Sequence, residues 1–248
     1  WASTAASPGA PTDSRLLEAA VGLALACLSF DFVGTCLDES ADDLGTVQAP
    51  STWRASVADP TTVALFFQVY ASAAPPLAPA ALECLVRLAS VRRSLFASDA
   101  ERGVFLAALV GGTRGLLAGR VGLDAHASYH ELCRLLGRLK TNYQLSELVA
   151  SPGYGDWVGR VADFTTSSLA APAWSGPSVF YLLGLWSRLV SSVPYLKADS
   201  PPLLEAHVPA VVRAFICSRL TSRSGRGLAS GSGDGARPGS GAPLNGGG

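Results

Sequence analysis

Residues 129–149 read YHELCRLLGRLKTNYQLSELV, and the pattern of their apolar residues predicts the class of fold. Its apolar side chains recur every three or four residues, the spacing of one face of an α-helix, and they do not alternate as in a strand. Residues 182–193 repeat the same spacing. We predict two helices with one buried face each, formed by Leu132, Leu135, Leu136, Leu139 and Tyr143 in the first and by Leu182, Leu185, Trp186, Leu189 and Val193 in the second.

The rest of the chain follows the same helical pattern, with prolines placed between the apolar segments rather than inside them. Two helix starts carry a serine and a glutamate three residues apart, the spacing of a capping box: Ser98 with Glu101, and Ser128 with Glu131. Helices joined by short turns, without any convincing strand, indicate an all-α stack of antiparallel helix pairs. The predicted helices are 13–29, 51–58, 60–72, 78–95, 99–120, 129–141, 143–150, 155–170, 178–192 and 209–220.

The composition sets the domain organisation and excludes several classes of function. Hydrophobic residues make up 48% of the 248 residues, enough for a large core, and nineteen basic residues balance nineteen acidic ones, so no overall charge favours nucleic acid or an anionic membrane. The longest apolar run, 19–30, is too short to cross a bilayer. The five scattered cysteines fit reduced thiols. We expect a flexible stub at 1–12, a helical-repeat segment at 13–221 and a disordered Gly/Ser-rich tail at 222–248. We also expect the chain to be a piece of a longer protein, because it starts at Trp1 and has no methionine.

Two motifs resemble sites for chemistry, and neither predicts an enzyme. His126, His130 and Cys133 have the residue types of a zinc site, but a helix that starts at Ser128 leaves His126 outside it, and no fourth ligand is evident. The glycines of 111–115 lack the Gly-Lys-Ser/Thr ending of a phosphate loop, so close helix packing or a kink explains them better. We expect no catalytic residues, no metal and no cofactor.

An acidic loop is the clearest candidate for a partner contact. Asp31, Asp38, Glu39, Asp42 and Asp43 form a local negative patch in a neutral protein, and such a patch suits a basic partner. The alternative is a solvated loop whose carboxylates only keep it soluble. Trp53, which follows in a short helix, is interpreted as an anchor of this loop on the core.

Basic residues form the second candidate surface. Arg92 and Arg93 interrupt an otherwise apolar predicted helix, and Arg134, Arg138 and Lys140 form a basic stripe along another. They could pair with the acidic loop or with an acidic cargo. The alternative is a solvent-facing helix side whose surface ion pairs contribute about 0–1 kcal/mol each.

The chain resembles the exportin-7 branch of the nuclear transport receptors over residues 15–220. The longest block is ALACLSFDFVGTCLDESADDLGTVQAPSTWR at 24–54, and YHELCRLLGRLKTNYQLSELV at 129–149 is the second. Shorter blocks keep the family's order and approximate spacing: SVRRSLF at 90–96, YLLGLWSRL at 181–189, SVPYLKA at 192–198 and ICSRL at 216–220.

This resemblance implies the repeat type and the function. It implies a HEAT-like α-solenoid from the N-terminal half of a large receptor, in which stacked repeats of about 40 residues each contact only their neighbours. It further implies partners, namely the GTPase Ran in its GTP form, folded protein cargo and nuclear pore proteins, and shuttling between nucleus and cytoplasm. A different hypothesis is a helical protein-interaction scaffold that never engages Ran.

Overall fold

The structure, a computed structural model, describes residues 11–32, 45–74, 76–197 and 201–227. Within these ranges the chain is helical, and the only β pairing is a single parallel bridge between Val47 and Val91. The long helices are α1 (Pro11–Ser29), α3 (Pro60–Ser72), α4 (Leu77–Ala89), α5 (Asp99–Gly119), α6 (His126–Asn142), α8 (Tyr154–Ala170), α10 (Val179–Ser192) and α11 (Val208–Gly227). Short helices and turns join them: η1 (Ser51–Trp53), α2 (Arg54–Val57), η2 (Arg93–Leu95), α7 (Leu145–Val149), α9 (Pro172–Ser175), η3 (Gly176–Ser178), η4 (Val193–Tyr195) and η5 (Leu204–Ala206).

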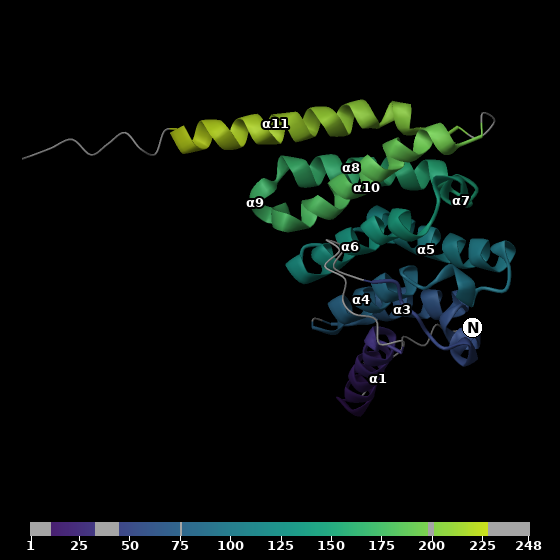
Figure 1. The fold of residues 1–248 in the computed structure, drawn as a ribbon. Helices are drawn as coiled ribbons and strands as arrows, with labels where there is room; N and C mark the ends of the chain where they lie inside the picture. The colour runs from purple at the N-terminus through teal and green to yellow at the C-terminus, as the bar shows by residue number, and fades with distance from the viewer. Residues whose placement is uncertain (1–10, 33–44, 75, 198–200, 228–248) are drawn as a thin grey trace, which may run out of the picture.

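The long helices stack in two rows, which rise from α1 at the bottom of Figure 1 to α11 at the top. One row is formed by α3, α5, α8 and α11, and the other by α1, α4, α6 and α10, each helix packing on the next of its row. Contacts between α3 and α4 and between α8 and α10 join the rows. A helix therefore packs on one that lies one helix pair further along the chain, which is the arrangement of a helical-repeat solenoid. This confirms the predicted all-α, HEAT-like fold.

The core lies between the rows and is made of the predicted helix faces. In α6 the side chains of Leu132, Leu135, Leu136, Leu139 and Tyr143 are all buried. In α10 the same is true of Leu182, Leu185, Trp186 and Leu189, whereas Val193 is only partly buried. The three-and-four spacing therefore predicted which face of each helix is covered.

Indole groups link neighbouring helices through threonine hydroxyls. The Nε1 of Trp157 in α8 donates to Oγ1 of Thr113 in α5 at 3.0 Å. The Nε1 of Trp186 in α10 donates to Oγ1 of Thr165 in α8, also at 3.0 Å. Each hydroxyl in turn donates to a carbonyl of its own helix, so these buried polar groups are satisfied.

The glycine-rich segment at 111–115 lies inside α5, as the packing interpretation predicted. Gly112 faces the ring of Phe67 in α3, and a Cβ atom at this position would overlap that ring. The absence of a side chain lets α3 and α5 approach closely in their row. Close helix packing, and not phosphate binding, therefore explains Gly112.

A buried arginine joins three elements near one side of the stack. Arg102 of α5 is 2% exposed, and its Nε lies 2.9 Å from Oε1 of Glu147 in α7. Its Nη2 donates to the carbonyl of Asn142 at 2.7 Å, and its guanidinium lies 4.1 Å from the ring centroid of Tyr143. An ionised side chain is stable in a core only when it is paired, so Arg102 has to keep these contacts in the folded chain. The contacts link α5 to the end of α6 and to α7.

The predicted helix at 78–95 is wrong beyond Ala89. The segment at 45–50 pairs with the chain after α4 through Val47, whose N–H donates to the carbonyl of Ser90 at 2.9 Å and whose carbonyl accepts from the N–H of Arg92 at 3.1 Å. The amide of Asn142 donates to the carbonyls of Ala89 and Val91 at 2.8 and 2.9 Å. These non-local hydrogen bonds replace the helical ones and end the helix.

The serine half of one of the two predicted capping boxes is present. The hydroxyl of Ser98 accepts from the N–H of Glu101 at 3.1 Å at the start of α5, and the Glu101 carboxylate accepts from the N–H of Ala97. The second prediction is wrong, because α6 begins at His126 and Ser128 is a buried residue of its first turn. A helix that starts two residues earlier leaves Ser128 no unpaired amide to cap.

The predicted terminal segments lie largely outside the described residues. Of the stub at 1–12, only residues 11 and 12 are described, as the start of α1. Of the tail at 222–248, residues 222–227 continue α11, and residues 228–248 lie outside the described part. The division at 221 stays a prediction.

Candidate functional site

Four of the five carboxylates of the predicted acidic loop, Asp38, Glu39, Asp42 and Asp43, lie outside the described residues, and the fifth, Asp31, lies within them. The residues on both sides of the loop are described. Phe32 lies between Phe30 and Trp53, with ring centroids 4.8 and 5.0 Å apart, and Trp53 packs against the core. The interpretation of Trp53 as an anchor on the core is therefore confirmed, and the acidic contact stays a prediction.

Arg92 and Arg93 do not lie in a helix interior, contrary to the prediction. They follow the turn that ends α4, and the side chains of both are exposed. Arg93 pairs with Asp99 at 2.6 Å, an ion pair with both partners more than half exposed, so it contributes little to stability. Arg92 lines a surface pocket together with Phe32 and Gln48.

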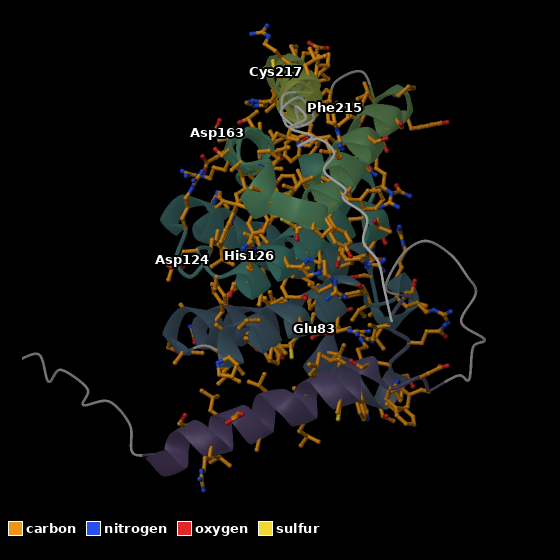
Figure 2. The ribbon with its side chains drawn as sticks, turned by 90° about the vertical axis from the view of Figure 1, so that its left-hand side faces the viewer. Glu83, Asp124, His126, Asp163, Phe215 and Cys217 are labelled. Atoms are coloured by element: carbon orange, nitrogen blue, oxygen red, sulfur yellow. The ribbon has the colours of Figure 1, made fainter. Side chains whose placement is uncertain are left out.

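Charged side chains of α4 and α6 are paired within their own helices, and the pair on α6 is the more deeply buried. Arg134 contacts Glu131 at 2.8 Å, with both side chains only 12% exposed. In α4, Arg87 contacts Glu83 at 3.3 Å. Burial raises the pKa of Glu131, and the negative charge of Glu83 acts in the same direction, although Arg134 opposes both. The two pairs therefore lie near enough to interact electrostatically, and Figure 2 shows Glu83 on the lower part of the stack.

The predicted basic stripe of α6 divides between two sides of the helix. The Nε of Arg138 donates to the hydroxyl of Ser90 at 2.8 Å, so Arg138 is directed toward α4 as part of the same side as Arg134. Lys140 is buried and lines a pocket with residues of η4, on the other side. Two residues along a helix correspond to a rotation of about 200°, which is why Arg138 and Lys140 do not share a face.

Sequence reasoning missed the residues of α10 and η4 that surround Lys140. Arg188 donates to the hydroxyl of Thr141 at 2.6 Å, and its charge acts on Lys140. Tyr195 is 87% exposed and lines the same pocket as Lys140. Both lie in sequence blocks that resemble the exportin-7 branch, but only the packing of α10 on α6 brings them to Lys140.

His126 and His130 both lie in α6, so the prediction that His126 lies outside this helix is wrong. Each of the two rings nevertheless has a contact other than a metal. His126, which is labelled in Figure 2, lies against Trp174, and the centroids of the two rings are 3.7 Å apart. His130 Nδ1 is 2.8 Å from the hydroxyl of Ser178. Burial raises the pKa of the Cys133 thiol to about 12. Within the described ranges, no three His, Cys, Asp or Glu side chains group as metal ligands would.

The described surface is suited to binding by charge. Paired charged groups lie on α4 and α6, and Arg188 of α10 lies near enough to Lys140 of α6 for its charge to act on it. In the described part of the chain, no helix combines the length and the apolar character needed to cross a membrane.

Comparison with known proteins gives a consistent result. The chain is 51% identical over 175 residues to exportin-7-A of Xenopus laevis, which covers 71% of this chain and 16% of that protein. It is 48% identical over 187 residues to Ran-binding protein 17 of Homo sapiens, covering 75% of this chain and 17% of the relative. It is 38% identical over 182 residues to exportin-7 of Dictyostelium discoideum, covering 73% and 18%. No family model matches the chain.

These relatives are much longer than the chain, which spans about a sixth of their length. Their names describe export and Ran binding and not catalysis. The identity extends over more than two thirds of the chain, as does the two-row helix stack. This chain therefore belongs, as a segment, to the family of exportin-7 and the Ran-binding proteins 16 and 17.

Proposed function

We propose that the chain is part of a nuclear export receptor that carries folded protein cargo through the nuclear pore in a manner that depends on Ran bound to GTP. The single observation that supports this is about 50% identity, over some three quarters of the chain, to proteins named exportin-7 and Ran-binding protein 17. The partners of the whole receptor are then Ran, cargo and nuclear pore proteins. Its location is the nucleus and the cytoplasm, between which it shuttles.

The proposed mechanism is mechanical, and this chain makes or breaks no bond. In a stack where each helix pair contacts only its neighbours, small rotations between pairs add up to a change of curvature. Ran and cargo that both favour one curvature raise each other's affinity by the same factor. Side chains that cross from one helix to the next, such as Trp157 and Trp186, then transmit part of each rotation.

The acidic loop belongs to this proposal as a contact for a basic partner. Its test is charge reversal of Asp38, Glu39, Asp42 and Asp43 together. The matched control is Asp163→Lys on α8, an exposed carboxylate for which no ion pair is found among the described residues. We expect the loop variant to lose partner binding and the control to keep it. Unchanged binding of every partner by the loop variant would remove the loop from the proposal.

The decisive experiment is a pull-down of the full-length product of this locus with Ran loaded with GTP or with GDP. We expect selective capture of the GTP form, because Ran-GTP is the partner that the family implies. A verified full-length protein that captures neither form would return the scaffold hypothesis. The comparisons do not favour that alternative, since the relatives are named for export and for Ran binding.

A further inference from the structure

A pocket of about 350 Å³ lies where the end of α6, the start of α7 and the turn η4 meet. Three kinds of side chain line it: the ammonium-bearing Lys140, neutral polar groups, and apolar groups. The polar groups are Gln144, Ser146 and Ser192. A pocket of this size falls in the range that accommodates a small ligand or a few side chains of a peptide, and it is too small for a folded element.

Lys140 carries a charge that no described group neutralises. Its residue is 9% exposed, and within the described ranges neither an ion pair within 4.0 Å nor a hydrogen bond is found for its ammonium. Glu147 is the carboxylate that acts on it, and that carboxylate already accepts from Arg102 at 2.9 Å and from the N–H of Gln144 at 2.7 Å. The residue is largely covered while its charge lines the pocket, so an anion that enters the pocket can pair with it.

The electrostatics around Lys140 favour an anion. Burial is the largest cause that lowers the pKa of Lys140, and the positive charge of Arg188 is the next. The ammonium therefore lies in a positive environment from which water is partly excluded. A carboxylate placed against it would relieve both the desolvation and the repulsion, and such charge-assisted contacts are stronger than neutral hydrogen bonds.

The other lining groups restrict the class of anion. Among the described residues that line the pocket, Lys140 is the one cationic residue, which matches a singly charged carboxylate better than a doubly charged phosphate. The hydroxyl of Ser146 and the side-chain amide of Gln144 can donate to a second carboxylate oxygen, whereas the hydroxyl of Ser192 already donates to the carbonyl of Arg188 at 2.7 Å. Tyr195, 87% exposed, together with Leu145 and Leu196, supplies an apolar wall beside the charge.

We propose that this pocket binds an acidic side chain of a protein partner, whose carboxylate pairs with Lys140 and whose neighbouring apolar residue packs on Tyr195. The inference goes beyond the proposed export function and does not depend on Ran, because it rests on the pocket alone. It also separates Lys140 from Arg134 and Arg138, which face α4.

The chain has only two lysines, Lys140 and Lys197, and this makes a direct test simple. Protein labelled with ¹³C at the lysine ε-carbon gives two side-chain signals, which the variant Lys197→Met assigns. The probes are acetylated tripeptide amides with a central glutamate between leucine or phenylalanine residues. The same tripeptides with glutamine in place of glutamate are the matched controls, and inorganic phosphate is a further probe.

We expect the glutamate peptides to shift the Lys140 signal in a saturable way, and to leave the signal of the exposed Lys197 in place. The glutamine peptides should bind at least about tenfold more weakly, since the charged contact is lost. Tyr195→Ala should weaken the glutamate peptides and change phosphate binding little. In Lys140→Met, the backbone amide signals of residues 144–146 should no longer respond to the glutamate peptides.

Several outcomes would overturn the proposal. One is the absence of a Lys140 response to every glutamate peptide, and another is an equal response to the glutamate and glutamine forms. Phosphate that saturates the Lys140 signal at lower concentration than the glutamate peptides would assign the pocket to phosphate instead. Lys140→Met with unchanged circular dichroism excludes unfolding as the reason for lost binding, and Lys197→Met controls for the loss of one surface charge.

Discussion

Replacing Arg102 with methionine removes the buried charge that joins α5 to α6 and α7, and we expect the free energy of unfolding to fall by about 3 kcal/mol. Removing one member of a buried ion pair costs about 3–5 kcal/mol, because the other charge stays behind without its partner. Here Glu147 keeps the N–H of Gln144 at 2.7 Å, and its side chain is 22% exposed. These two facts put the loss from the pair at the lower end of that range.

Two further terms nearly cancel. The carbonyl of Asn142 loses its charged donor at 2.7 Å, which costs about 1 kcal/mol. Methionine, however, keeps an unbranched apolar chain against Tyr143, and it removes the guanidinium Nη1, which has no hydrogen-bond partner among the described groups. The net expectation therefore stays at about 3 kcal/mol.

The assay is urea unfolding followed by far-ultraviolet circular dichroism, which is sensitive because the described chain is helical. A shift of the midpoint at constant slope reports the change in stability. The control is Arg160→Met, which breaks an exposed pair with Asp156 at 3.0 Å and should cost below about 1 kcal/mol. Adding Glu147→Gln to Arg102→Met should restore about 1 kcal/mol, since the stranded charge is then gone.

Arg102→Met that destabilises the chain no more than Arg160→Met does would contradict this expectation. The Arg102 cluster would then be a peripheral contact, and the link between α5 and α7 would depend on apolar packing alone. A double variant that is less stable than Arg102→Met would also contradict the assignment of the loss to an uncompensated Glu147.

Three other predictions follow from burial and packing. Lys140→Met should raise the free energy of unfolding at neutral pH, by no more than about 1 kcal/mol, because it removes a partly desolvated charge. Because the folded-state pKa of Lys140 is lowered, the wild type should recover this difference as the pH rises from that pKa toward 10.5, which urea titrations at several pH values would show, and a difference that widens with pH would contradict this. Gly112→Val should lower the free energy of unfolding by about 1–3 kcal/mol, measured by thermal unfolding, because the valine side chain meets the ring of Phe67. Adding Phe67→Ala should restore part of this loss, whereas a loss caused by helix propensity alone would not be restored. Burial raises the pKa values of Cys84 and Cys133 to about 12, so both thiols should resist alkylation in the native chain and react only on unfolding, as measured by peptide mass spectrometry. Rapid labelling of either thiol in the native chain would instead show that its helix opens.

Local patterns predicted most of the fold. The helices around residues 60–72 and 155–170 have the predicted ends within a residue, and the apolar face of α6 is the buried one. These features depend on interactions between residues three or four apart, which a sequence contains in full. The capping contact at Ser98 was predictable for the same reason.

The errors occur where a distant segment decides the local structure. The chain leaves α4 at Ala89 because Val47 and Asn142 take over its hydrogen bonds, and both lie more than forty residues away in sequence. Ser128 lost its predicted capping role because α6 starts at the preceding turn. Neither outcome follows from the spacing of nearby residues.

The amino-acid pattern alone predicts that this protein is helical and which helix faces are buried, because both depend on residues three or four apart in the chain. The order of residues over most of the chain also places it in its family. Which charges lie close together across helices depends on how the helices pack. The packing of α10 on α6 places Tyr195 and Arg188 beside Lys140 and separates Lys140 from the arginines of its own helix. Electrostatic and hydrogen-bond contacts act over a few ångströms in space whatever the distance along the chain, so the pocket at Lys140 exists only once the two helices have packed.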